Sequence, residues 1–213
     1  MTLELSKNLG GIGALLMVIG TLGFLGQYTS ILSLIGLILV LVALNGLANH
    51  YSERGIFNYA LYGILTAIAG GVVTVAIVFV ALLGFLTDIG LSLANLIDVT
   101  AVSRIDWQGI VTLDSVWPFL AALVLGLVVL FVFLVISSFL IKKSLDLTSA
   151  KTGVGMFHTA GLLLLIGAFL TIIIIGLLLI FIAMILLIVA FFQIRTQPAA
   201  APSPPPQPTP PPQ

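Results

Sequence analysis

The chain has 213 residues, of which 61% are hydrophobic and only 7% are charged. A soluble domain carries about 25% charged residues because water must solvate its surface, so this composition predicts a protein whose side chains mostly face lipid. The formal net charge is zero, which gives no reason to expect a nucleic-acid partner. The absence of cysteine excludes disulfides, thiolate metal sites and cysteine nucleophiles.

Six apolar runs are long enough to cross a bilayer, whose core of about 30 Å needs about 20 helical residues. The runs do not alternate in polarity as barrel strands do, so they predict an all-α, polytopic transmembrane bundle over residues 1–195. The first run is expected to be a retained span rather than a cleaved signal peptide, because no cleavage pattern follows Gly26. The predicted spans lie near residues 9–26, 30–48, 59–86, 116–141, 157–175 and 177–194.

The fifth and sixth spans share one apolar stretch, residues 157–194. Gly176 is the predicted turn between them, since glycine tolerates the backbone angles that a turn requires. The predicted tip, residues 172–178, contains nothing polar, whereas a tip in water normally carries turn residues. The alternative to two full spans is therefore a shallow hairpin whose tip stays within the membrane.

An even number of spans places most cationic residues on one side of the membrane. The other side receives only Arg104. Because positive charge accumulates on the cytoplasmic side, the sequence predicts a multi-pass protein of the cell membrane with both termini in the cytoplasm. The residues on the predicted cytoplasmic side are Lys7, Arg54, Lys142, Lys143, Lys151 and Arg195.

The long extracytoplasmic loop, residues 87–115, is acidic but not purely polar. Ile89, Leu93, Leu96 and Ile97 recur at helical spacing, which predicts a short helix on the outer membrane surface. We interpret it as a connecting lid; a lid over a substrate and a partner-binding surface are the alternatives.

The carboxyl-terminal segment, residues 196–213, holds nine of the ten prolines. Such a segment cannot bury a core, and it favours extended polyproline II. We expect a disordered cytoplasmic tail that acts as a spacer. The alternative is a cytoplasmic partner with an aromatic groove.

The first and last hairpins are similar in sequence. Residues 35–43 resemble residues 175–183, and residues 15–20 resemble residues 162–167. This similarity predicts a paired-hairpin repeat, although apolar segments match easily by chance.

Three glycine-rich or polar segments carry a resemblance to a known family. They are residues 7–13 (KNLGGIG), 49–58 (NHYSERGIFN) and 151–161 (KTGVGMFHTAG). On these segments the chain resembles an uncharacterised family of archaeal multi-pass membrane proteins, a domain of unknown function, over residues 1 to about 195. The resemblance implies an archaeal cell membrane, and it brings no activity, substrate or catalytic residue.

Eight polar side chains form the candidate set at the predicted cytoplasmic face. Histidines and carboxylates together can bind a metal or act as acid and base. No ligand spacing such as His-x-x-x-His occurs, so no metal, cofactor or catalytic residue is predicted; we expect topology-setting cations, local ion pairs and contact with anionic lipid. The set is His50, Glu53, Arg54, Lys142, Lys143, Asp146, Lys151 and His158.

Small residues on the third span predict a close helix contact. Gly63, Ala67 and Gly71 recur every four residues, and such ladders let helix backbones approach in lipid. We expect packing within the chain; the alternative is the interface of a homo-oligomer. Hydroxyl-bearing residues within the spans, such as Thr66, Thr74 and Thr171, are expected to bond neighbouring helices.

No ionisable residue lies in the middle of any span, although such residues mark proton relays and ion paths. The leading hypothesis is therefore a non-enzymatic membrane protein that acts through helix packing, lipid contact or partner assembly. The alternatives are a small-solute transporter or channel and a membrane enzyme with a cytoplasmic-face site. A polar cavity near the midplane would favour transport, and a convergent histidine–carboxylate cluster would favour an enzyme.

Overall fold

The computed structural model describes residues 2–22, 29–88 and 113–195, and within these ranges it contains helices and no strand. Six of the helices are long and apolar enough to cross a membrane. The predicted all-α bundle of six spans is confirmed. The helices are α1 (Leu3–Thr21), α2 (Thr29–His50), α3 (Arg54–Asp88), α7 (Leu113–Thr152), α8 (Gly155–Leu170) and α9 (Ile175–Gln193), with a 3₁₀ turn η1 (Thr171–Ile173) before α9.

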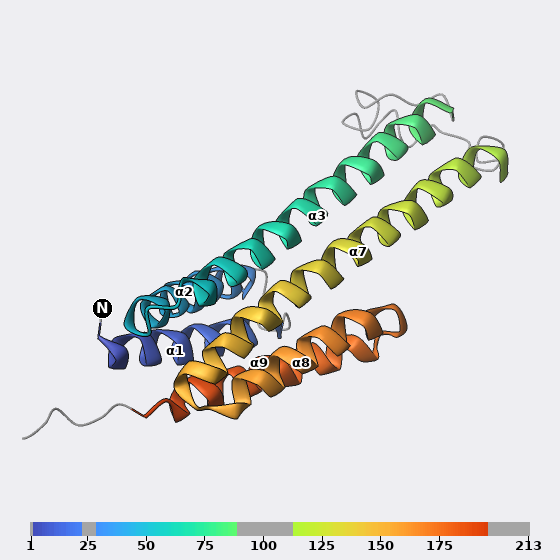
Figure 1. Cartoon of the computed structure of the whole chain (residues 1–213). Helices are drawn as coiled ribbons and strands as arrows, with labels where there is room; N and C mark the ends of the chain where they lie inside the picture. The colour runs from blue at the N-terminus through green and yellow to red at the C-terminus, as the bar shows by residue number, and fades with distance from the viewer. Residues whose placement is uncertain (1, 23–28, 89–112, 196–213) are drawn as a thin grey trace, which may run out of the picture.

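The helices form three antiparallel hairpins, α1–α2, α3–α7 and α8–α9 (Figure 1). The hairpins contact one another through α2 with α3, α7 with α8, and α1 with α9, which closes a ring. Thr2, residues 51–53, residues 153–154 and Arg195 all lie at the same end of the molecule (Figure 1). We call this the joined end, because the three hairpins meet there.

The tightly packed core lies near the joined end. Phe157 of α8 and Phe191 of α9 are fully buried there, with their rings edge to face at 5.1 Å between centroids. Leu47, Ile56 and Leu145 bring α2, α3 and α7 into the same cluster. The core therefore joins all three hairpins at one end only.

Away from the joined end the hairpins separate. α3 and α7 extend beyond the tips of the other two hairpins (Figure 1). Away from the joined end, many apolar side chains of α3 and α7 face the surroundings. Val75 is 67% exposed and Val124 is 58% exposed. Lipid, rather than protein, is the natural solvent for such a surface.

The two longest helices run past the apolar segments that predicted them. α3 begins at Arg54 instead of near residue 59, and α7 continues to Thr152 instead of ending near residue 141. At 35 and 40 residues they measure about 52 and 60 Å. Apolarity marks the part of a helix that faces lipid, whereas the helix itself continues through Lys, Leu and Ala, which favour helix.

The turn of the last hairpin lies at Ile174, two residues before the predicted Gly176. Ile174 adopts φ 64°, an uncommon conformation for a β-branched residue. Gly176 instead belongs to α9, where it meets the backbone of Gly167 and Thr171. Glycine is needed here for close approach of two helices and not for the turn.

The first hairpin uses a similar contact. A Cβ placed on Gly36 of α2 would lie 2.5 Å from the carbonyl oxygen of Gly13 on α1. Gly36 and Gly176 hold matching positions in the two similar stretches, residues 35–43 and 175–183. A glycine pair thus lies where the helices cross in both the first and the last hairpin, in keeping with the predicted repeat.

Few hydroxyl groups within the spans bond a neighbouring helix. Thr74 of α3 donates to the carbonyl oxygen of Gly126 on α7 at 3.3 Å, as expected. Thr66 and Thr171, in contrast, donate to carbonyls of their own helices, at Tyr62 and Gly167. A threonine in a helix can satisfy its hydroxyl on the preceding turn, so it does not need a partner helix.

The predicted surface helix of the outer loop and the Pro-rich tail both lie outside the described residues. Of residues 87–115, the structure describes only the end of α3 and the start of α7.

Candidate functional site at the joined end

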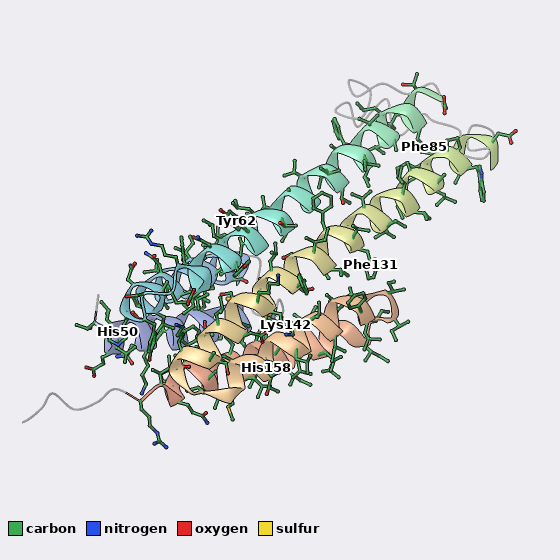
Figure 2. All side chains as sticks on the ribbon, viewed as in Figure 1. His50, Tyr62, Phe85, Phe131, Lys142 and His158 are labelled. Carbon is green, nitrogen blue, oxygen red and sulfur yellow. The ribbon has the colours of Figure 1, made fainter. Side chains whose placement is uncertain are left out.

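Three of the predicted polar residues converge between α7 and α8. The Asp146 carboxylate accepts a hydrogen bond from Lys142 Nζ at 2.5 Å, and its other oxygen lies 2.8 Å from His158 Nδ1. Lys142 and Asp146 are one turn apart on α7, whereas His158 comes from α8. Figure 2 labels Lys142 and His158 close together near the joined end.

Gly161 makes room for this cluster. A Cβ at Gly161 would lie 3.3 Å from both Cα and Cγ of Lys142, so the lysine stem crosses α8 directly over the glycine. The three side chains remain accessible, with exposed fractions of 20% for Lys142, 32% for Asp146 and 57% for His158. The Lys142–Asp146–His158 cluster is thus a surface feature beside the α7–α8 contact.

The remaining candidates fall into separate places. Glu53, before α3, pairs with Lys151 of α7 at 3.2 Å, while His50 and Arg54 are exposed. Lys143 Nζ lies over two aromatic rings, 5.5 Å from the centroid of Tyr59 and 4.9 Å from that of Phe139.

Partial burial affects the acidity of the Tyr51 hydroxyl. It follows α2, with its ring edge-on to His50 at 4.9 Å between centroids. Burial raises the pKa of Tyr51 above its usual value of 10.0, because desolvation disfavours the phenolate. Tyr51 therefore stays a neutral hydrogen-bonding group at physiological pH.

The cluster can orient and polarise an imidazole. A carboxylate on Nδ1 fixes the tautomer and leaves Nε2 free for a ligand or a proton. Only one histidine and one carboxylate take part, and within the described ranges no three His, Asp or Glu side chains lie close enough to hold a metal ion. The arrangement thus offers a hydrogen-bonding site with a cation beside it.

Replacing Asp146 with Asn is expected to change the free energy of unfolding by less than about 1 kcal/mol, because exposed ion pairs contribute little. Thermal unfolding in detergent of the wild type and of D146N measures the difference. A loss of several kcal/mol would mean that the cluster is structural and not a site for binding.

Two apolar clefts lie along α7. One of about 400 Å³ lies between α7 and η1, lined by Val124, Leu127, Phe131, Leu134 and Ile172, among others. Another, of about 560 Å³, lies between the outer ends of α3 and α7 and includes Phe85 and Phe119. Their lining is almost wholly hydrocarbon, so neither is a polar path near the midplane.

The predicted ladder on α3 is divided between two faces. Gly63 is buried against Ser137 and Ile141 of α7, whereas Ala67 is exposed and nothing lies within 4 Å of a Cβ at Gly71. Gly70 takes the second contact position, against Phe133. A step of seven residues nearly preserves direction on a helix of 3.6 residues per turn, whereas a step of eight turns it by about 80°.

Replacing Gly63 with Leu is therefore expected to destabilise the α3–α7 pair by about 2 kcal/mol, because the larger side chain overpacks the contact. Replacing Gly71 with Leu is the matched control and is expected to leave stability unchanged. The test compares unfolding of both variants in detergent, with size-exclusion profiles. If Gly71→Leu instead changed the oligomeric state, the outward face would be an interface between copies.

The sequence analysis did not predict that Lys142, Asp146 and His158 are in contact. The signal for this cluster was the i, i+4 spacing of Lys142 and Asp146, which is typical of helical ion pairs. That signal is useful only if the helix continues past residue 141, and the predicted span ended there.

Comparison with known proteins shows related sequences but assigns them no function. Residues 32–185 match the family described as "Protein of unknown function (DUF996)". An uncharacterized protein of the archaeon Methanocaldococcus jannaschii is 32% identical over 194 residues, which cover 91% of this chain and 94% of that one. No solved structure matches. With the family match spanning most of the chain and a relative aligned over nearly its whole length, the chain belongs to the DUF996 family of proteins of unknown function.

Proposed function

We propose that this protein is a non-enzymatic component of the cell membrane that acts through contact with lipid. Both termini and the joined end lie in the cytoplasm, and the separated ends of the hairpins face the outer leaflet. The observation that carries the proposal is the apolar surface that the hairpins expose where they diverge, such as Val75, Val124 and Ile172. A tightly closed bundle would hide this surface, whereas here lipid can enter between the hairpins.

The charge distribution supports the orientation. Six cationic side chains and three carboxylates belong to the part of the bundle nearest the joined end, whereas Asp88 and Asp114 mark the opposite ends of α3 and α7. Positive charge retained on the cytoplasmic side is the general rule for membrane proteins.

The chain lacks cysteine, so single cysteines test the orientation without background labelling. A membrane-impermeant maleimide applied to intact cells should label Asp114→Cys and should leave Ala150→Cys unlabelled until the cells are permeabilised. Both positions are exposed, so neither is protected by packing. The reverse pattern would place the joined end outside and reject the proposed orientation.

Solute transport is the competing function, and a dye-release assay with phospholipid vesicles distinguishes it from lipid contact. Purified protein reconstituted in phospholipid vesicles should release a small trapped dye no faster than protein-free vesicles, because the two clefts along α7 are apolar. Efflux that rises with the amount of protein would favour a channel or transporter.

A membrane enzyme is the second candidate, and the Asp146–His158 pair favours it. A carboxylate-oriented histidine at the cytoplasmic face resembles the base of many hydrolytic sites. Phospholipid vesicles incubated with the protein should show no cleaved headgroup or acyl chain under the leading proposal. Cleavage that is lost in His158→Ala would favour the enzyme.

A further inference from the structure

The cleft between α7 and η1 and the Lys142–Asp146–His158 cluster lie on the same side of α7. Lys142 follows Phe131 by eleven residues, which returns the side chain to within about 20° of the same direction on α7. Both therefore lie on the side of α7 that faces α8, where Phe131 packs near Phe169 and Lys142 crosses Gly161. Figure 2 shows Phe131, Lys142 and His158 in this order toward the joined end.

The spacing along this surface fits one leaflet of a bilayer. Eleven helical residues separate Phe131 from Lys142 by about 16 Å. Half of a bilayer core is about 15 Å, so an acyl chain that starts at the level of Lys142 ends at the level of the cleft. Leu162 and Ile166 of α8, each 40% exposed, supply an apolar surface between the two.

The polar end of this surface favours a negative headgroup. Lys142 Nζ carries two N–H donors besides the one that Asp146 accepts. Across this whole end of the bundle, cationic side chains outnumber carboxylates two to one. A zwitterionic headgroup would gain little from this excess.

We propose that this surface binds one anionic phospholipid of the bilayer. Its phosphate lies at Lys142, and one acyl chain lies in the cleft between α7 and η1. The inference rests on the proposed lipid-contact function and assigns that contact to a specific place on the molecule.

The test measures lipid binding to the full chain in detergent by native mass spectrometry. Phosphatidylglycerol is titrated in parallel with phosphatidylcholine and with glycerol phosphate, which has the headgroup chemistry but no acyl chains. The wild type should bind one phosphatidylglycerol most tightly and glycerol phosphate weakly. Equal binding of phosphatidylcholine, or binding of glycerol phosphate as tight as that of the lipid, would overturn the proposal.

Two variants locate the binding. Lys142→Gln should weaken phosphatidylglycerol binding about fivefold, as expected for the loss of one lysine near an anionic headgroup, while Lys7→Gln should not. Leu127→Trp should weaken it by filling the cleft. Leu125→Trp is the matched control, because both leucines are 56% exposed on α7 and only Leu127 lines the cleft.

Unchanged binding in both Lys142→Gln and Leu127→Trp would overturn the proposed site. The lipid-contact function would survive that result, because dye retention in vesicles tests it independently. Dye efflux together with selective phosphatidylglycerol binding would instead reject the function and retain the site.

Discussion

Replacing Gly176 with Val is expected to destabilise the α8–α9 hairpin by about 3 kcal/mol. A Cβ at this position would lie 2.1 Å from the carbonyl oxygen of Gly167 and 2.3 Å from the backbone nitrogen of Thr171. These are backbone atoms, so no side chain can rotate away, and the two helices must part. Lipid offers little compensating drive for helices to stay together.

The loss is measured by unfolding in a graded mixture of mild detergent and sodium dodecyl sulfate. Gly84→Val is the matched control, because nothing lies within 4 Å of a Cβ at Gly84 of α3. Both substitutions replace a helical glycine with valine, so their difference reports mainly the contact. Equal stability of the two variants would mean that α8 and α9 do not cross at Gly176.

The second large effect is expected where the first and last hairpins meet. Phe191 of α9 is fully buried, and a Cβ on Gly10 of α1 would lie 2.2 Å from its ring. Phe191→Ala is expected to cost about 3 kcal/mol, because it opens a cavity beside Phe157. Gly10→Leu is expected to destabilise as well, because its side chain overlaps the ring.

Combining the two substitutions provides the sharper measurement. The leucine of Gly10→Leu can fill the space that Phe191→Ala opens, so the double variant should be more stable than the sum of the single losses predicts. Residues in contact couple by about 0.5–3 kcal/mol in such cycles. Strictly additive losses would show that α1 and α9 do not touch at these residues.

The spans were predictable because lipid imposes a simple requirement of length and apolarity. The placement of helix ends was not, since residues 142–152 of α7 are mostly polar yet remain helical. The role of Gly176 was also hidden, because a turn and a close helix contact both select a residue without a Cβ. Whether the glycine at position 176 serves a turn or a helix contact depends on where Gly167 lies in space. The sequence alone does not show that Gly167 is its neighbour.

The candidate site was predictable as a set of residue types near one face, but not as a constellation. Asp146 meets His158 only because Gly153, at φ 73°, and Val154 reverse the chain between α7 and α8. Glu53 and Lys151 meet because α3 and α7 pack side by side near the joined end. Tertiary contacts of this kind depend on the angle between helices, which side-chain packing fixes.

The central claim is that the hairpins are joined at one end and separated by lipid at the other. Val124 and Ser138 test it directly, because they lie on the same side of α7, and Val124 is 58% exposed whereas Ser138 is buried at 7%. Single cysteines at the two positions carry spin labels in protein reconstituted in bilayers, and electron paramagnetic resonance measures their collision rate with oxygen dissolved in lipid. We predict frequent collisions at Val124→Cys and rare collisions at Ser138→Cys. Rare collisions at both positions would show a bundle closed along its whole length and would contradict the account.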